Sequence, residues 1–190
     1  MKKIALFASG SGTNVENIIN YFKDNQQIHI ELVMTNNPDA YVIKRAEKSG
    51  TDCMIFNKND FYNTDNVLNT LINRKIDFII LAGFLWLVPS ALINYYPKKI
   101  VNIHPALLPK FGGKGMYGMK VHESVIANKE KESGITVHLV NEKYDDGSVI
   151  FQKRCEITSV DNAESLANKI HKIEYEYYPQ IIEKIVTNKI

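Results

Sequence analysis

The chain has 190 residues, of which 45% are hydrophobic and 23% charged, and its formal net charge is +2 at pH 7. These values predict one globular domain with a sizeable core. Only three arginines occur and no basic cluster forms, which argues against a nucleic-acid partner. No apolar run reaches the length of a membrane span and no signal peptide is recognisable, so we expect a cytoplasmic protein without a membrane partner. Two isolated cysteines, Cys53 and Cys155, predict neither a disulfide framework nor a zinc site.

The first half of the chain alternates short apolar runs with helical patterns. Strands are predicted over residues 4–8, 28–34, 54–56, 77–82 and in a run that ends at residue 104. Helices are predicted from residue 13 onward, where Thr13 and Glu16 suggest a capping box, and over residues 39–48, 67–74 and 89–95. This alternation predicts a parallel sheet with right-handed crossovers.

The second half departs from that pattern. Residues 110–118 hold four glycines and predict a loop. A helix over 119–128, two strands over 135–140 and 149–157, and a final helix over 162–177 follow. With no repeat or linker, we expect one Rossmann-like α/β domain over residues 1–190. Its mostly parallel twisted sheet should carry helices on both faces, with a C-terminal strand pair and a last helix.

A glycine-containing loop, Ser9-Gly10-Ser11-Gly12-Thr13-Asn14, lies between the first strand and its helix. Backbone amides at such a helix start form an anion site, which favours a phosphate ligand. The third glycine of a dinucleotide fingerprint is absent, because position 15 is Val15, and no acidic residue ends the second strand. A nicotinamide cofactor is therefore disfavoured. A tight turn with an ordinary helix start is the alternative.

Two polar residues, Asn102 and His104, end the strand that begins near residue 100. Residues i and i+2 of a strand point the same way, so this amide and this imidazole should share one side. Such a pair at the carboxyl end of a strand could stabilise an oxyanion. The alternative is a strand end with two solvated side chains.

Two motifs in the second half resemble those of the folate-dependent formyltransferases. Residues 102–109, Asn-Ile-His-Pro-Ala-Leu-Leu-Pro, resemble the family signature Asn-x-His-Pro-Ser/Ala-Leu-Leu-Pro. Residues 137–147, ending in Tyr-Asp-Asp-Gly, resemble a second motif whose aspartate faces the Asn/His pair. The resemblance runs from about residue 3 to residue 179. It implies transfer of a formyl group from 10-formyltetrahydrofolate to the amine of phosphoribosylglycinamide in purine biosynthesis, without a metal.

The resemblance also implies roles for individual residues. Catalysis would fall to Asn102, His104 and Asp145, with Asp145 keeping His104 charged by raising its pKa. Gly12, Thr13 and Asn14 would bind the substrate phosphate, and Glu174 the substrate amine unless it is a helix-surface charge. Residues 1–100 would form the ribonucleotide side and 101–190 the catalytic and folate side. The folate would contact Leu85, Trp86, Leu87, Val88, Asn102, Asn141 and Asp145.

Several alternatives stay open at this level. Trp86 stands where relatives commonly carry arginine, and Asp146 competes with Asp145 as the inward-facing acid. His138 shares a strand face with Thr136, which favours a supporting role, and His122 lies in an amphipathic helix, which favours the surface or packing. A metal site from His104, His138 and Asp145 has no spacing signature.

Three further expectations complete the sequence analysis. The Leu108–Pro109 bond is a candidate cis peptide because the family turns sharply there. The partners should be small-molecule substrates, and the protein a monomer or homodimer. A sister formyltransferase acting on another amine, such as a nucleotide sugar, and a non-catalytic module that binds a phosphate ligand are the competing functions.

Overall fold

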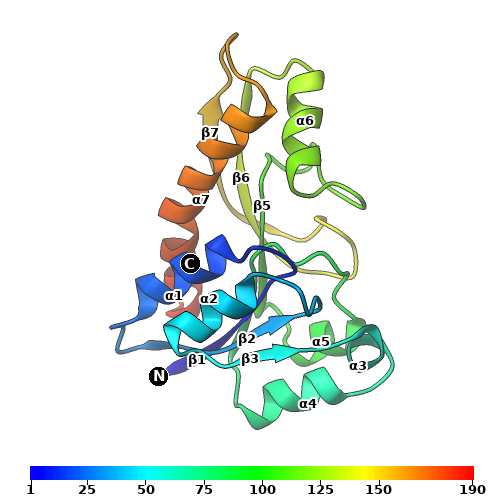
Figure 1. The fold of residues 1–190 in the computed structure, drawn as a ribbon, viewed down its shortest axis with the longest axis vertical. Helices are drawn as coiled ribbons and strands as arrows, with labels where there is room; N and C mark the ends of the chain where they lie inside the picture. The colour runs from blue at the N-terminus through cyan, green and yellow to red at the C-terminus, as the bar shows by residue number, and fades with distance from the viewer.

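One seven-stranded sheet runs through the computed structural model, which describes residues 1–190 (Figure 1). Its strands stand in the order β3-β2-β1-β4-β5-β6-β7. The strand bounds are Lys2–Phe7 (β1), Ile28–Thr35 (β2), Cys53–Ile55 (β3), Phe78–Leu81 (β4), Ile100–His104 (β5), Glu132–Leu139 (β6) and Val149–Glu156 (β7). The predicted α/β domain with a C-terminal strand pair is confirmed.

The first five strands are parallel, whereas β6 and β7 join the sheet antiparallel. Consequently the carboxyl ends of β1, β4 and β5 meet at one edge of the sheet. Asn102 and His104 at the end of β5 pair with His138 and Thr136 of β6. Ligands of open α/β sheets bind at this edge, so the two predicted site segments fall where one ligand can reach both.

Helices cover both faces of the sheet. Their bounds are Thr13–Phe22 (α1), Val42–Ser49 (α2), Lys58–Tyr62 (α3), Asn66–Asn73 (α4), Ser90–Tyr95 (α5), Met119–Ala127 (α6) and Ala163–Val186 (α7). Successive side chains of β1 point to opposite faces of the sheet and so join two different cores. Ile4 and Leu6 belong to the core under α1, α2, α6 and α7. Ala5 and Phe7 belong to the core under α3, α4 and α5. None of the helices is long and apolar enough to cross a membrane.

The last helix continues nine residues beyond its predicted end, and Pro179 lies inside it. A proline within a helix leaves the carbonyl four residues earlier without its usual donor. Here that carbonyl belongs to Tyr175, and the side-chain amide of Asn17 in α1 donates to it at 2.9 Å. A tertiary contact therefore replaces the missing helical bond, and the prediction that the helix stops at Tyr177 is wrong.

The cap of one helix and the start of another also differ from prediction. Gly12, with φ of 73°, is the N-cap of α1, so Thr13 is the first helical residue and makes no capping box. The Glu16 carboxylate pairs with Arg45 instead. Helix α2 begins at Val42 rather than near Asp39, and the short helix α3 was not expected.

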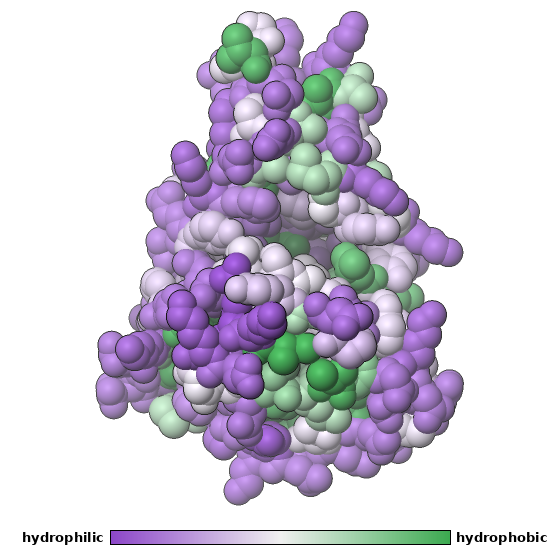
Figure 2. All heavy atoms as spheres, viewed as in Figure 1, coloured by the Kyte–Doolittle hydropathy of each residue, from purple (hydrophilic) through white to green (hydrophobic).

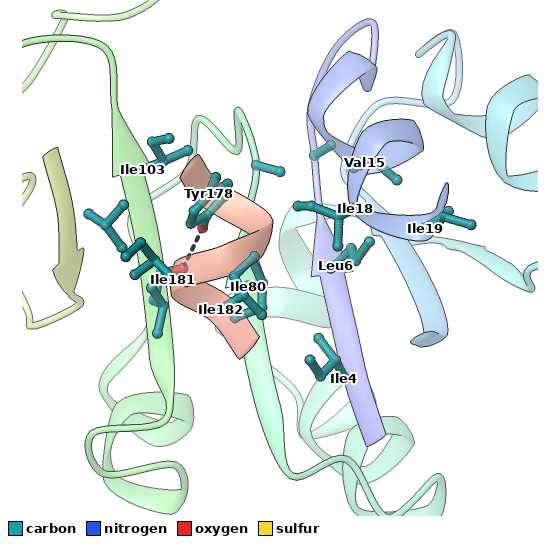
Figure 3. Packing of buried hydrophobic residues seen from close by; sticks show 14 of the residues in the cluster. Ile4, Leu6, Val15, Ile18, Ile19, Ile80, Ile103, Tyr178, Ile181 and Ile182 are labelled. Carbon is teal, nitrogen blue, oxygen red and sulfur yellow. Dashed lines mark hydrogen bonds between the residues drawn. The ribbon is translucent and has the colours of Figure 1, made fainter. Parts of the chain in front are cut away.

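Tyr178 anchors the last helix to the middle of the sheet. Its fully buried hydroxyl donates to the carbonyl of Leu81 at 2.8 Å, with the carbonyl of Val101 3.4 Å away. Figure 3 shows Tyr178, Ile181 and Ile182 of α7 packed beside β4 and β5, while Ile18 of α1 lies over β1. This packing fixes the segment of α7 that carries Glu174 against the carboxyl edge of the sheet.

Candidate active site

A cleft of about 570 Å³ opens at the carboxyl edge of the sheet. Figure 2 shows a hollow in the middle of this face, with apolar side chains gathered below it. The lining comprises the glycine loop, the segment after β4, the end of β5, the loops before α6 and β7, and side chains of α6 and α7. The predicted site residues among them are Gly12, Thr13, Asn14, Leu85, Asn102, His104, Asp145 and Glu174.

Asn102 lies at the centre of a hydrogen-bonded group. Its Nδ2 is 3.0 Å from Nε2 of His138 and 3.4 Å from Oδ1 of Asp145. Nδ1 of His138 faces the carbonyl of Leu139 at 2.9 Å, which requires a proton on Nδ1 and leaves Nε2 as the acceptor. His138 therefore orients the Asn102 amide, in agreement with the supporting role expected for it.

His104 is buried between two acceptors. Its Nε2 donates to the carbonyl of Phe111 at 2.7 Å, and its Nδ1 is 3.5 Å from Oδ2 of Asp145. Burial lowers the pKa of His104, and although Asp145 and the Phe111 carbonyl act to raise it, the pKa stays below its ordinary value. The expectation that Asp145 keeps His104 charged in the free protein is therefore wrong, because desolvation outweighs the attraction.

Asp145, rather than Asp146, faces the cleft. Burial alone would raise the pKa of Asp145, but the groups around its carboxylate, among them the Gly113 amide, hold it below its usual value. That amide donates to Oδ2 at 2.9 Å. Asp146 is exposed and accepts from Asn141 instead.

The backbone around this group is strained. Asp145 and Phe111 both have positive φ, 53° and 56°, a region that costs non-glycine residues energy. A Cβ at Gly112 would lie 2.4 Å from the end of the Leu108 side chain and 3.2 Å from Cβ of Asp145, so glycine lets the loop approach Asp145 without displacing Leu108. The loop thus brings the Phe111 carbonyl and the Gly113 amide to the site.

Thr136 holds the segment after His104. Its buried hydroxyl donates to the carbonyl of Ala106 at 2.7 Å and accepts from the Leu108 amide at 3.0 Å. Gln152 of β7 donates to the same oxygen at 2.9 Å. The Leu108–Pro109 bond in this segment is cis, as predicted.

The glycine loop presents backbone rather than side chains. Gly12 lies so close to α2 that a Cβ there would be 2.3 Å from Val42. Arg45 of α2 donates to the carbonyl of Ser11 at 2.9 Å and holds the loop from behind. Because the first amides of a helix lack intrahelical partners, those of α1 are available to an anion in the cleft.

Glu174 is buried in the cleft wall, 5% exposed, and is not a helix-surface charge. Its Oε2 accepts from Nδ2 of Asn14 at 3.0 Å. Burial raises the pKa of Glu174 to about 7, although the hydrogen bond from Asn14 acts to lower it. The carboxyl group can therefore change its protonation near neutral pH, next to the glycine loop.

Some of the residues predicted to hold the folate line the cleft, and others lie outside it. Leu85 lines the cleft, as do Phe84 and Tyr144. The Trp86 ring packs against Phe61 and Tyr62, and Val88 is buried in the core beneath. Leu87 offers its carbonyl to Tyr62, and Asn141 bonds Asp146 outside the cleft. The folate assignment of these residues remains a prediction.

The cleft also contains residues that the sequence analysis did not assign to it. His122 is buried and lines the cleft, whereas surface or simple packing was expected, and His171 lines it as well. A signal existed only for His171, which lies three residues before Glu174 and therefore on the same helix face. No group of three or more His, Cys, Asp or Glu side chains is arranged to hold a metal ion.

The formyl transferase family matches residues 2–182 of the chain. The chain is 36% identical over 195 residues to the chloroplastic phosphoribosylglycinamide formyltransferase of Arabidopsis thaliana, covering 100% of this chain and 67% of the plant protein. It is 36% identical over 191 residues to the phosphoribosylglycinamide formyltransferase of Bacillus subtilis (strain 168), covering 98% and 95%. A crystal structure of phosphoribosylglycinamide formyltransferase from Anaplasma phagocytophilum matches with a TM-score of 0.90 at 28% identity, covering 100% of this chain and 88% of that one. The chain therefore belongs to the formyl transferase family.

Proposed function

We propose that this protein transfers the formyl group of 10-formyltetrahydrofolate to the primary amine of phosphoribosylglycinamide, a step of purine biosynthesis. One observation carries the proposal: an amide, an imidazole and a carboxylate line the same cleft as an anion-binding glycine loop. The two substrates are small molecules, which suits a cleft of this volume. A metal has no part in the proposed chemistry.

Asn102 is the proposed oxyanion donor. As the amine attacks the formyl carbon, a C–N bond forms and the carbonyl oxygen becomes negative. One hydrogen of the Asn102 amide makes only a long bond of 3.4 Å to Asp145, so the oxyanion can take that hydrogen. Removing one such donor typically slows an enzyme by about 10²–10³-fold.

His104 is the proposed proton carrier. The Phe111 carbonyl fixes the ring proton on Nε2, which leaves Nδ1 free to accept the proton of the attacking nitrogen. The imidazolium so formed lies between Asp145 and the Phe111 carbonyl, two groups that favour its charge. When the oxyanion collapses and the bond from carbon to N10 breaks, His104 returns the proton to N10. Tetrahydrofolate and the formylated amide leave.

The glycine loop and Glu174 are the proposed ribonucleotide site. Amides of Gly12, Thr13 and Asn14 bind the phosphate, while Glu174 accepts a hydrogen bond from the amine and holds it near His104. Leu85 to Val88, Asn141 and Asp145 contact the folate. All of these assignments rest on the family resemblance. The shared cleft supports those of the glycine loop, Glu174, Leu85 and Asp145, whereas the other folate residues do not line it.

Purified protein tests the proposal directly. Incubation with 10-formyltetrahydrofolate and phosphoribosylglycinamide should release tetrahydrofolate and a product one formyl group heavier, measured by absorbance and mass spectrometry. A nucleotide-sugar amine and a reaction without amine serve as comparisons. Faster transfer to the nucleotide sugar would reassign the substrate. Binding of the ribonucleotide without any transfer would support a non-catalytic module.

A further inference from the structure

Helix α1 packs against α7 and faces it with two asparagines, of which Asn17 has no role in the proposed mechanism (Figure 1). Asn14 and Asn17 are three residues apart and therefore share one face of α1. Asn14 donates to the Glu174 carboxyl group at 3.0 Å, and Asn17 donates to the backbone carbonyl of Tyr175 at 2.9 Å. The second bond is thus made to the residue that follows Glu174, the proposed hydrogen-bond acceptor of the substrate amine.

The Tyr175 carbonyl needs a donor from outside its helix because Pro179 lies four residues later. Proline has no N–H, and its ring excludes the carbonyl four residues earlier from a helical bond. The turn of α7 that follows Glu174 therefore lacks one of the bonds that would fix it from within. The side-chain amide of Asn17 supplies a donor, so the placement of this turn depends on α1.

This turn is held differently on its two sides. Tyr178, which belongs to the turn, is fully buried in the core and packs beside the sheet. The other side of the turn meets α1 through the half-buried Asn17. Glu174 is 5% exposed in the cleft wall, so a small shift of the turn would admit water to its carboxyl group or withdraw that group from a ligand.

We propose that Asn17 is a positioning residue, which ties the proline-containing turn of α7 to α1 and thereby holds Glu174 at the ribonucleotide side of the cleft. The role belongs to the side chain of a residue that does not line the cleft itself. This inference rests on the proposed function, because the contact between Glu174 and the substrate amine is taken from it.

Calorimetry and kinetics with phosphoribosylglycinamide test the inference. Asn17→Ala should weaken binding of this ligand about tenfold, the effect of one lost hydrogen bond, whereas the KM for 10-formyltetrahydrofolate should not change. Pro179→Ala supplies a backbone amide that can donate to the Tyr175 carbonyl from within the helix. In that background, Asn17→Ala should therefore cause no further loss of affinity. Equal losses in the wild-type and Pro179→Ala backgrounds would overturn the inference.

A second background shows whether Asn17 acts through Glu174. Glu174→Ala removes the carboxyl group, so adding Asn17→Ala should cost no further affinity, and an additive loss would overturn the inference. Tyr21→Phe is the matched control, because it also removes a hydrogen bond from α1 to α7, but one made to Glu183 further along the helix. This control should bind the ribonucleotide like the wild type. A loss as large as that of Asn17→Ala would contradict a specific role of Asn17.

An NMR titration of Glu174 without ligand separates the inference from the proposed function. Burial raises the pKa of Glu174 to about 7, so the water admitted by Asn17→Ala should lower that pKa, and Pro179→Ala should restore it in the double variant. Asn17→Leu keeps the size of the side chain without its donor and should act like Asn17→Ala, which guards against a folding failure of one variant. An unchanged Glu174 titration in both would overturn the inference. A wild-type protein that does not bind phosphoribosylglycinamide would contradict the proposed function, and the titration would still decide the role of Asn17.

Discussion

The two ends of the cleft are built in different ways. The glycine loop is contiguous in sequence and offers backbone amides, and its shape depends on the tight approach of Gly12 to Val42. The catalytic group combines side chains of β5, β6 and the loop before β7, and a distant loop holds them through the Phe111 carbonyl and the Gly113 amide. The first end should therefore be sensitive to steric changes, and the second to the chemistry of single side chains.

The largest expected effect is the loss of rate when the catalytic group is changed. Asp145→Asn and His104→Ala should each lower kcat about 100-fold or more, because each removes part of the proton-transfer group. The double variant should be little worse than either, since residues acting as a unit are not additive. Stopped-flow kinetics measures the rates, and calorimetry should show unchanged ribonucleotide binding.

The Asp145→Asn variant also tests how Asp145 affects the pKa of His104. Asp145 favours the imidazolium, so Asp145→Asn should lower the pKa of His104 further, which an NMR titration would detect. Asp146→Asn is the matched control at the exposed neighbour and should leave both kcat and the titration unchanged. A near-normal rate for Asp145→Asn would show that Asp145 does not serve His104.

A larger side chain in the glycine loop should distort that end of the cleft. Gly12→Ala combines a left-handed backbone with a clash against Val42, and it should cost about 2–4 kcal/mol and weaken ribonucleotide binding. Gly10→Ala, two residues away, meets nothing within 4 Å and is the matched control. Urea unfolding and calorimetry measure both effects. Equal behaviour of the two variants would contradict the role assigned to the loop shape.

Glu174 joins the two ends and should make stability depend on pH. Its pKa is raised in the folded state to about 7, so the stability it contributes is complete below its unfolded value near 4.5 and is lost as pH rises through 7. The free energy of unfolding should fall by up to about 3 kcal/mol between pH 5 and pH 8 through this group. Glu174→Gln should abolish that part of the fall. An identical pH dependence in wild type and variant, measured by urea unfolding, would show that the carboxyl group is not desolvated.

The smallest expected effect concerns Tyr178, which anchors α7 to the sheet. Tyr178→Phe removes a buried hydroxyl that donates to the carbonyl of Leu81, and it should lower stability by about 1 kcal/mol. Since the ring still fills its place, kcat and ribonucleotide affinity should change little. A large loss of activity would mean that the hydroxyl, rather than packing, positions Glu174.

Much of the fold was predictable because it depends on local patterns. Continuous apolar runs such as Ile4 to Ala8 identify buried strands. The two-residue spacing of Asn102 and His104 along a strand predicts that they share one side, and both line the cleft. The end of α7 was not predictable, because the Tyr175 carbonyl that Pro179 leaves without a helical donor is bonded by Asn17, more than 150 residues away in sequence.

The chemistry of the site was only partly predictable, for the same reason. The resemblance to the family motifs identified His104 and Asp145, but burial, which reverses the expected pKa shift of His104, is a tertiary property. The buried positions of Glu174 and His122 likewise depend on how α6 and α7 pack against each other. The cap of α1 was predicted wrongly, because Gly12 in a left-handed conformation, rather than the Thr13 side chain, precedes the helix.

A crystal structure with phosphoribosylglycinamide bound tests most directly whether one ligand joins the two ends. We predict that the phosphate lies within hydrogen-bond distance of the amides of Gly12, Thr13 and Asn14, and that the amine lies beside Glu174 and His104. A phosphate bound elsewhere, or an amine outside reach of Asn102 and His104, would contradict the account.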